Sequence, residues 1–306
     1  MSEISQQVPV YLDYCRYQKK LNSKTIKAYS IDLAQFFSKV SGTAYKALKA
    51  EIVNYITHLH KTYLPRTAKR KLASVIAFFN YLEYEEILPD NPLHKIKTKF
   101  QEPKVLPRAI PLNAIEKILS AAYENLKWAA TSYASHKALR DVTVVEMLFA
   151  TGMRVSELCS LGAQDVDLED GRVLIHGKGA KERVLQVGNS EVLALLRQYH
   201  EENMCQIAET GCFFTGRLGL RLSEQSVRST LSRLCEQAGV PHGTPHMLRH
   251  SFATFLLEED VDIRYIQRML GHGSIQTTQI YTQVATAKQR QILELKHPRN
   301  KIVVRK

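Results

Sequence analysis

The chain has 306 residues, of which 44% are hydrophobic, which is enough to bury two ordinary cores, so two domains are expected. Its 42 Lys and Arg residues outnumber 30 Asp and Glu, giving a net charge of +12, which is typical of phosphate-binding proteins without proving DNA binding. Because it has neither an apolar N-terminal stretch nor an apolar run of about 18 residues, no signal peptide or membrane span is expected.

The first 97 residues are predicted to be entirely helical. Apolar residues recur at spacings of three and four. Ser23 is a plausible N-cap, and Pro65 separates two neighbouring helices. The predicted helices cover about 4–20, 23–40, 47–63 and 66–86.

The last of these helices begins with four basic residues: Arg66, Lys69, Arg70 and Lys71. They precede an apolar face, so the basic end of the helix could rest on the phosphate backbone of DNA. For any single one of these residues, an ordinary solvated position is the alternative.

Residues 98–110 are predicted to link two domains, because Pro103 and Pro107 alternate there with charges and no helical periodicity is present. The expected domains are therefore 1–97 and 111–306. The second domain begins with a helical pattern, IPLNAIEKILSAAY. Cysteines number five, an odd count with no C-x-x-C pair, which predicts reduced thiols in a cytosolic setting.

A first cluster of candidate site residues lies in the middle of the chain. In ATGMRVSEL, Gly152 is predicted to end one helix and Arg154 to begin the next. Two short strands, 172–176 and 183–187, follow and are joined by a glycine-rich turn with Lys178 at its tip. A lysine there could donate a proton to a leaving oxygen.

A second cluster runs from Thr244 to Tyr281. The apolar pattern predicts a helix over 245–258, which places His246 and Arg249 on one face. Gly271 is predicted to stop a later helix, so His272 lies on the following loop, and Tyr281 comes nine residues after it.

These residue types suit a metal-free attack on a phosphodiester. Arginine binds two phosphate oxygens in parallel and stays charged, which stabilises the charge that develops in the transition state. A tyrosine hydroxyl has a pKa of about 10, so it needs a base or a cationic pocket to act as a nucleophile, and histidine is the obvious base.

Two other chemistries are less consistent with the sequence. His246 and His250 have the i, i+4 spacing of zinc ligands, but the helix lacks the Glu of H-E-x-x-H, and no ligating cysteine pair follows. We assign His250 a structural hydrogen bond behind the site. The turn around Lys178 lacks the spacing of a phosphate-binding loop and joins two strands, so nucleotide binding is not expected there.

Taken together, the motifs strongly resemble the tyrosine recombinase (phage integrase) family over nearly the whole chain. The family's motif positions match Arg154 and Glu157 in TGMRVSEL, Lys178 in GKGAKER, His246 and Arg249 in HMLRH, His272 in LGH, and the nucleophile Tyr281 in TTQIYTQV.

The resemblance implies a mechanism. Tyr281 would attack the scissile phosphate to form a 3′-phosphotyrosyl link, and two rounds of exchange would pass through a Holliday junction without ATP, metal or cofactor. Arg154 and Arg249 would bind the non-bridging oxygens, and His272 would hydrogen-bond the phosphate. Lys178 would be the general acid, and His246 would help to deprotonate Tyr281. Glu157 would orient Arg154 or a neighbouring basic group.

The resemblance also implies the DNA breaking-rejoining enzyme fold, which is mainly α. This fold combines an N-terminal four-helix SAM-like core-binding domain with a mainly helical catalytic domain that contains a small three-stranded antiparallel sheet. The chain looks closer to Xer-like and other simple recombinases, with a mobile-element integrase as the alternative, and we expect no additional arm-site-binding domain. One departure is segment 125–141, which is longer and more polar than expected between the first two helices of the catalytic domain.

The expected partner is double-stranded DNA with a specific core site, bound in the cytoplasm at the nucleoid by a homotetramer or by a heterotetramer with a paralogue. The C-terminal tail, 286–306, has an apolar pattern in Ile292, Leu293 and Leu295. This stripe is too short to fold alone, so it could pack on a neighbouring subunit or, alternatively, on its own domain.

Two other functions fit parts of the pattern. A type IB topoisomerase-like enzyme would use similar residues to nick and reseal one duplex, but the motifs match the recombinase forms more closely. A non-catalytic DNA-binding protein of the same fold would not depend on Tyr281.

Overall fold

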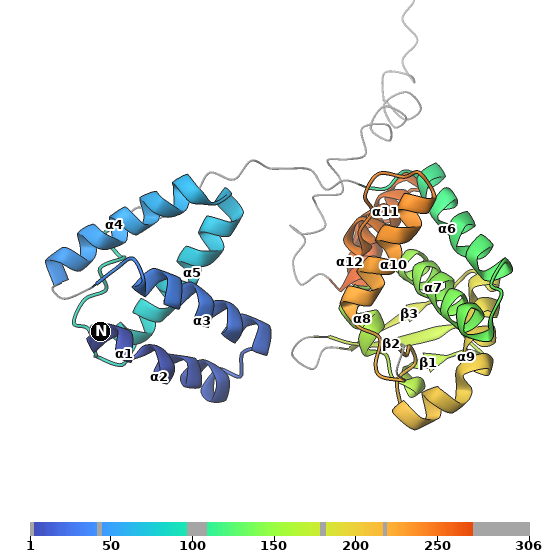
Figure 1. Cartoon of the computed structure of the whole chain (residues 1–306), viewed down its shortest axis with the longest axis horizontal. Coiled ribbons are helices and arrows are strands. Elements are labelled where there is room, and N and C mark those ends of the chain that lie inside the picture. Colours follow the sequence, from blue (N-terminus) through green and yellow to red (C-terminus); the bar gives the residue numbers. More distant parts are fainter. Residues whose placement is uncertain (1–2, 42–44, 97–108, 178–181, 217–218, 272–306) are drawn as a thin grey trace, which may run out of the picture. The chain divides into compact units, whose positions relative to one another are not determined.

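The computed structural model describes residues 3–41, 45–96, 109–177, 182–216 and 219–271, and the chain divides into two compact units, Met1–Lys104 and Val105–Lys306 (Figure 1). The helices and the small sheet confirm the predicted fold class, which is mainly α. None of the helices in the described ranges is both long and apolar enough to cross a membrane.

In its described residues, the N-terminal unit contains four helical segments, the first of which is broken. They comprise α1 (Glu3–Gln6), α2 (Val8–Asp13) with a π-helical turn (Tyr14–Gln18), α3 (Ser23–Phe37), α4 (Tyr45–Thr62) and α5 (Pro65–Tyr84). The predicted helical segment 4–20 corresponds to α1, α2 and the π-helical turn, with an interruption at Gln7. Pro9 has no N–H and sits in the first turn of α2, so it favours a new helix start over a continuation of α1.

The boundaries of α3 and α5 follow from their caps. Asn22, and not the predicted Ser23, is the N-cap of α3, because its Oδ1 accepts a hydrogen bond of 2.8 Å from the Lys24 N–H. Pro65 is the first residue of α5, where its missing N–H costs nothing. The core between the helices is rich in aromatic rings, with Phe36 and Phe79 packed edge to face at 5.9 Å between ring centroids.

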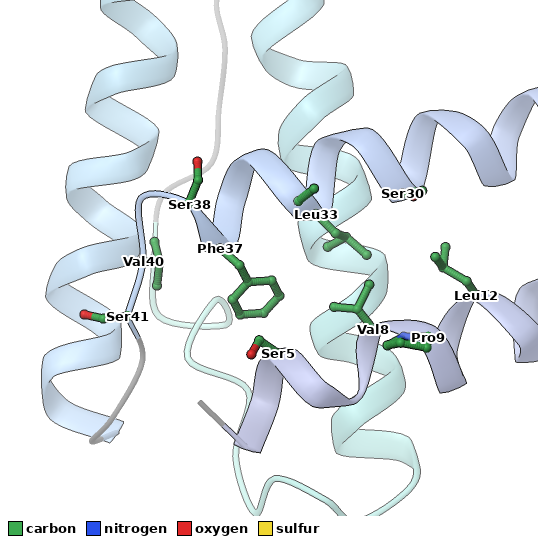
Figure 2. A pocket seen from close by; sticks show the side chains of 11 residues that line it. Ser5, Val8, Pro9, Leu12, Ser30, Leu33, Phe37, Ser38, Val40 and Ser41 are labelled. Carbon is green, nitrogen blue, oxygen red and sulfur yellow. The ribbon is translucent and has the colours of Figure 1, made fainter. Parts of the chain in front are cut away.

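An apolar hollow of about 780 Å³ lies between the first two helices and α3 (Figure 2). Val8 and Leu12 line it from α2, and Leu33 and Phe37 line it from α3. It lies beside the break between α1 and α2, where two short helices cover α3 in place of one long helix.

A buried ionic network joins α3 to α5. Asp32 is fully buried and accepts hydrogen bonds from Arg70 (2.9 Å to Nη2), Lys71 (3.3 Å) and Ser74 (2.7 Å). The Lys71 side chain is 6% exposed and also donates to Gln35. Its ammonium is therefore turned into the protein, which argues against the predicted DNA contact from Lys71.

Asp32→Asn is expected to lower the free energy of unfolding by about 3 kcal/mol, because it leaves the Lys71 ammonium buried without its counter-charge. Burial raises the pKa of the Asp32 carboxyl, but hydrogen bonds from Arg70 and Ser74 outweigh it and hold the pKa below its usual value. The stabilisation is thus fully present above the unfolded-state pKa of about 4 and is lost as the pH falls through the folded-state pKa.

Urea titrations of the full chain at about pH 7 and about pH 3 measure this effect. Asp13→Asn is the matched control, since Asp13 forms an exposed pair with Arg16 and should contribute at most about 0.5 kcal/mol. Equal losses for the two variants at neutral pH would contradict the prediction.

The second unit is built around helix α7. It contains α6 (Leu112–Lys127), α7 (Ser132–Thr151), α8 (Val155–Ser160), a 3₁₀ turn (Ala163–Asp165), strands β1 (Val166–Asp167), β2 (Arg172–His176) and β3 (Glu182–Gln186), then α9 (Ser190–Thr210), α10 (Glu224–Gln237), α11 (Pro245–Glu258) and α12 (Ile263–Leu270). Helix α7 packs against α6, α9 and α11, and its Val142, Met147 and Leu148 are buried.

The sheet has the order β1-β2-β3, with both pairs antiparallel, as predicted. In the register of β2 and β3, Ile175 lies opposite Arg183 and His176 opposite Glu182. Successive residues of a strand face opposite sides, so Arg183 shares a face with the buried Leu185.

Segment 125–141 is not a long connection. Residues 128–131 alone join α6 to α7, and Thr131 caps α7 by accepting a hydrogen bond of 3.1 Å from the Ala134 N–H. The segment is polar because the first turns of α7 lie at the surface, where Tyr133 is 58% exposed. Residues 132–141 therefore belong to α7 and not to a connection between helices.

Candidate active site

Arg154 stands at the start of α8, directly after the turn that ends α7. Gly152 ends α7 with a φ of 63°, and a Cβ there would lie 2.4 Å from the Phe252 ring, so glycine is required. Arg154 is the N-cap of α8, and its guanidinium donates to Glu157 Oε1 (2.7 Å) and to the Gly271 carbonyl oxygen (3.3 Å). Its side chain is 37% exposed, so it can still meet a ligand.

Helix α11 has the predicted bounds and carries Arg249 and the two histidines. Thr244 caps it by accepting a hydrogen bond of 3.2 Å from the Met247 N–H. Arg249 is only 4% exposed, and its Nη1 and Nη2 donate to the carbonyl oxygens of Gly152 (2.7 Å) and Leu270 (2.6 Å). Arg249 thereby joins the C-terminal ends of α7 and α12, and is more deeply buried than the predicted cleft position.

Both histidines of α11 have a pKa below the ordinary value of the imidazole. Partial burial lowers the pKa of His246, and the nearby positive charges of Arg249, Arg228 and Arg154 lower it further. Burial, followed by the influence of His246 and Arg249, lowers the pKa of His250 to about 4. A neutral imidazole can accept a proton near neutral pH.

Glu157 is the shared anion of the cluster. It accepts from the backbone N–H of Arg154 at 2.8 Å, which satisfies the start of α8, as well as from the Arg154 guanidinium. Burial raises the pKa of its carboxyl, but hydrogen bonds from Arg183 and Arg154 outweigh burial and bring the pKa to about 2. The structure thus brings Glu157 to Arg154, as the sequence predicted.

Arg183 of β3 is a part of the cluster that the sequence analysis missed. Its Nη1 and Nη2 donate to the two carboxylate oxygens of Glu157 at 3.0 and 2.8 Å, and its Nε donates to the Met269 carbonyl oxygen at 2.9 Å. A signal was present, because strand alternation places Arg183 on the same face as the apolar Leu185. A charge on an inward face requires a partner.

Three arginines from distant parts of the sequence therefore converge on the end of α12. Arg183, Arg249 and Arg154 contact the carbonyl oxygens of residues 269, 270 and 271 in turn. Position 272, the predicted phosphate-binding histidine, follows directly in the sequence. His272, Tyr281, Lys178 and the tail 286–306 lie outside the described residues.

Metal-ligating side chains come together elsewhere. Within the described part of the chain, a group of three lies within 4.8 Å only at Glu83, Asp90 and His94, in the N-terminal unit. Asp90 there forms an ion pair with Lys95. The zinc interpretation of His246 and His250 thus gains no support from their described surroundings.

Comparisons with known proteins assign the family. Residues 109–288 match the phage integrase family, and residues 8–86 match the phage integrase N-terminal SAM-like domain. The chain belongs to the phage integrase family. A tyrosine recombinase from Agathobacter rectalis is 49% identical to this phage integrase family member over 301 residues, covering 98% of each chain. Tyrosine recombinase XerD from Listeria innocua is 33% identical, covering 94% of this chain and 97% of the relative.

Solved structures agree on the fold of this tyrosine recombinase. XerA recombinase is 25% identical, with a TM-score of 0.53, over 97% of this chain and 99% of that one. XerH recombinase bound to palindromic difH substrate is 23% identical, with a TM-score of 0.71, over 95% and 84%. The sequence prediction of a tyrosine recombinase is thus confirmed.

Proposed function

We propose that this recombinase cuts and rejoins double-stranded DNA at a specific core site, with Tyr281 as nucleophile and Arg154, Lys178, His246, Arg249 and His272 as the other catalytic residues. The observation that carries the proposal is the convergence of Arg154 and Arg249, from separate helices, on the two residues that precede His272. His246 supplies the base, because burial and the positive charges of Arg249, Arg228 and Arg154 lower its pKa and so favour the neutral imidazole.

The proposed step is a transesterification. The Tyr281 hydroxyl oxygen attacks phosphorus and passes its proton to His246, while the bond from phosphorus to the 5′ oxygen breaks and Lys178 protonates that oxygen. The products are a 3′-phosphotyrosine and a 5′-hydroxyl. Attack by the 5′-hydroxyl of a partner strand reverses the chemistry, and two rounds exchange both strands through a Holliday junction.

The arginine cluster suits the charge that develops on phosphorus oxygens. Arg154 is the more exposed of the two proposed phosphate-binding arginines and can donate directly to a non-bridging oxygen. Arg249 is held rigidly by two carbonyl oxygens, so its charge is fixed before substrate binds. One such charge 4 Å from an anion is worth about 4 kcal/mol in a partly solvated site.

The N-terminal unit is proposed to bind the DNA backbone through the start of α5. Arg66, Lys69 and Arg70 are exposed there, whereas Lys71 is buried against Asp32. Arg66→Gln combined with Lys69→Gln is expected to weaken DNA binding on all sequences. Because two phosphate contacts are lost, the slope of log K against log salt should fall by about 2.

Fluorescence anisotropy across a salt series measures that slope. Lys95→Gln is the control, since Lys95 is 73% exposed but pairs with Asp90. An unchanged slope in the double variant would remove the start of α5 from the proposed DNA-binding surface.

We further propose that the active form is a tetramer on DNA in the cytoplasm, with segment 286–306 packed on a neighbouring subunit. Support comes from a lambda integrase tetramer bound to a Holliday junction, whose chain has this fold with a TM-score of 0.64. Counting subunits by native mass measurement of the DNA complex tests the tetramer.

The proposed function is tested with a nicked duplex taken from chromosomal DNA beside this protein's own coding sequence. Nicking lets the short cleaved strand diffuse away, so the covalent adduct accumulates. Transfer of a labelled strand to a second duplex is the result expected of a recombinase. Relaxation of supercoiled plasmid without strand transfer would favour the topoisomerase-like alternative.

A further inference from the structure

Arg183 uses its whole guanidinium fork to join two parts of the candidate site. Its Nη1 and Nη2 each donate to one carboxylate oxygen of Glu157, and its Nε donates to the Met269 carbonyl oxygen. The side chain is 16% exposed and the carboxylate 9% exposed, so the pair is largely shielded from water. Such a bidentate pair fixes direction as well as distance.

The same guanidinium packs against the turn that ends α12. Gly271 has a φ of 64°, and a Cβ at this position would lie 2.9 Å from Arg183 Nη1 and 3.0 Å from its Cζ. Arg183 therefore donates to the Met269 carbonyl oxygen and occupies the space that a side chain at position 271 would need. These two residues flank Leu270, whose carbonyl oxygen is bound by Arg249. Through Arg183, strand β3 therefore supports residues 269–271, which directly precede His272 in the sequence.

The charges in the cluster show a second role. Glu157 is ionised because its pKa is about 2, and it faces the positive charges of both Arg154 and Arg183. Without Arg183, the Glu157 carboxylate would pair with Arg154 only, and the net charge of these two groups would be zero. With Arg183 present, the three groups retain one net positive charge beside the exposed Arg154.

We infer that Arg183 is a positioning residue for DNA cleavage, which holds the end of α12 and prevents Glu157 from neutralising Arg154. This inference rests on the proposed function of the same site. It assigns to Arg183 no direct contact with DNA, because Nε, Nη1 and Nη2 each donate to a protein oxygen and the side chain is only 16% exposed.

The experiment compares single-turnover adduct formation on the nicked duplex for the full-length wild type, Arg183→Met, Arg183→Lys, and Arg183→Met with Glu157→Gln. Arg183→Met is expected to slow cleavage about 100-fold, as for a misplaced catalytic group, while the Kd for DNA changes less than about threefold. Arg183→Lys keeps the charge but cannot bind Glu157 and Met269 together, so a loss of about tenfold is expected.

The double variant separates positioning from simple stabilisation. Removing the Glu157 charge should restore about tenfold of the rate lost in Arg183→Met, because Arg154 is no longer neutralised. A purely structural role predicts no recovery in the double variant, with rate losses that follow the thermal midpoint. If Arg183→Met does not fold, the same comparison is made between Arg183→Gln alone and Arg183→Gln with Glu157→Gln, because glutamine also removes the charge at position 183.

Wild-type rates in Arg183→Met, or an absence of recovery in the double variant, would overturn the inference. A wild-type protein that forms no adduct would instead overturn the proposed function. Wild type and Tyr281→Phe are therefore measured first, and they decide the function before Arg183 is tested.

Discussion

Replacing Tyr281 with phenylalanine is expected to abolish the covalent protein–DNA adduct, with a loss of at least about 10⁴-fold in cleavage rate. The change removes one oxygen atom, which is the proposed nucleophile, and leaves the ring and the cationic groups in place. Binding of uncleaved duplex should therefore stay within about twofold of wild type. Denaturing gels measure the adduct, and anisotropy measures the binding.

Tyr265→Phe is the matched control. Tyr265 lies on α12 and is 60% exposed, so losing its hydroxyl should change neither measurement. A non-catalytic DNA-binding protein would retain all its activities in Tyr281→Phe, and that result would contradict the enzyme assignment.

Arg249→Lys is expected to slow cleavage about 10³-fold and to lower the free energy of unfolding by about 2 kcal/mol. One ammonium cannot replace the planar fork that binds the carbonyl oxygens of Gly152 and Leu270 at once. At least one buried carbonyl oxygen then loses its partner, and the ends of α7 and α12 are no longer tied together.

Single-turnover cleavage and urea unfolding of the same preparation measure the two losses for Arg249→Lys. Arg264→Lys is the control, because Arg264 is 80% exposed and its pair with Asp262 lies in solvent, so neither cleavage nor stability should change. Full cleavage activity in Arg249→Lys would show that a point charge is sufficient and that the fixed fork is unnecessary.

The sequence predicted a helix boundary correctly where the residues of one short segment determine it. Helix α11 has its predicted bounds because Thr244 caps it and Pro245 opens it, and Gly271 ends α12 in the left-handed conformation as predicted. The break at Gln7 between α1 and α2 was not predictable in this way, because apolar spacing continues across Pro9, which lacks the N–H that a continuous helix would use.

The side-chain contacts that the sequence analysis missed depend on partners far away in the sequence. Lys71 has the same local pattern as Arg70, but the buried Asp32 on α3 draws its ammonium inward. Arg183 is separated from Glu157 by 26 residues and from Met269 by 86, so no local pattern places it in the site. Periodicity placed Arg249 on a face with His246, yet its burial depends on the ends of two other helices.

The central claim is that a tyrosine hydroxyl of this chain becomes esterified to DNA in an arginine-lined site. Peptide mapping by mass spectrometry, after nuclease digestion of the adduct trapped on the nicked duplex, locates the bond directly. We predict a single modified peptide, with a nucleotide phosphate on Tyr281. A nucleotide attached to any other side chain would contradict the account.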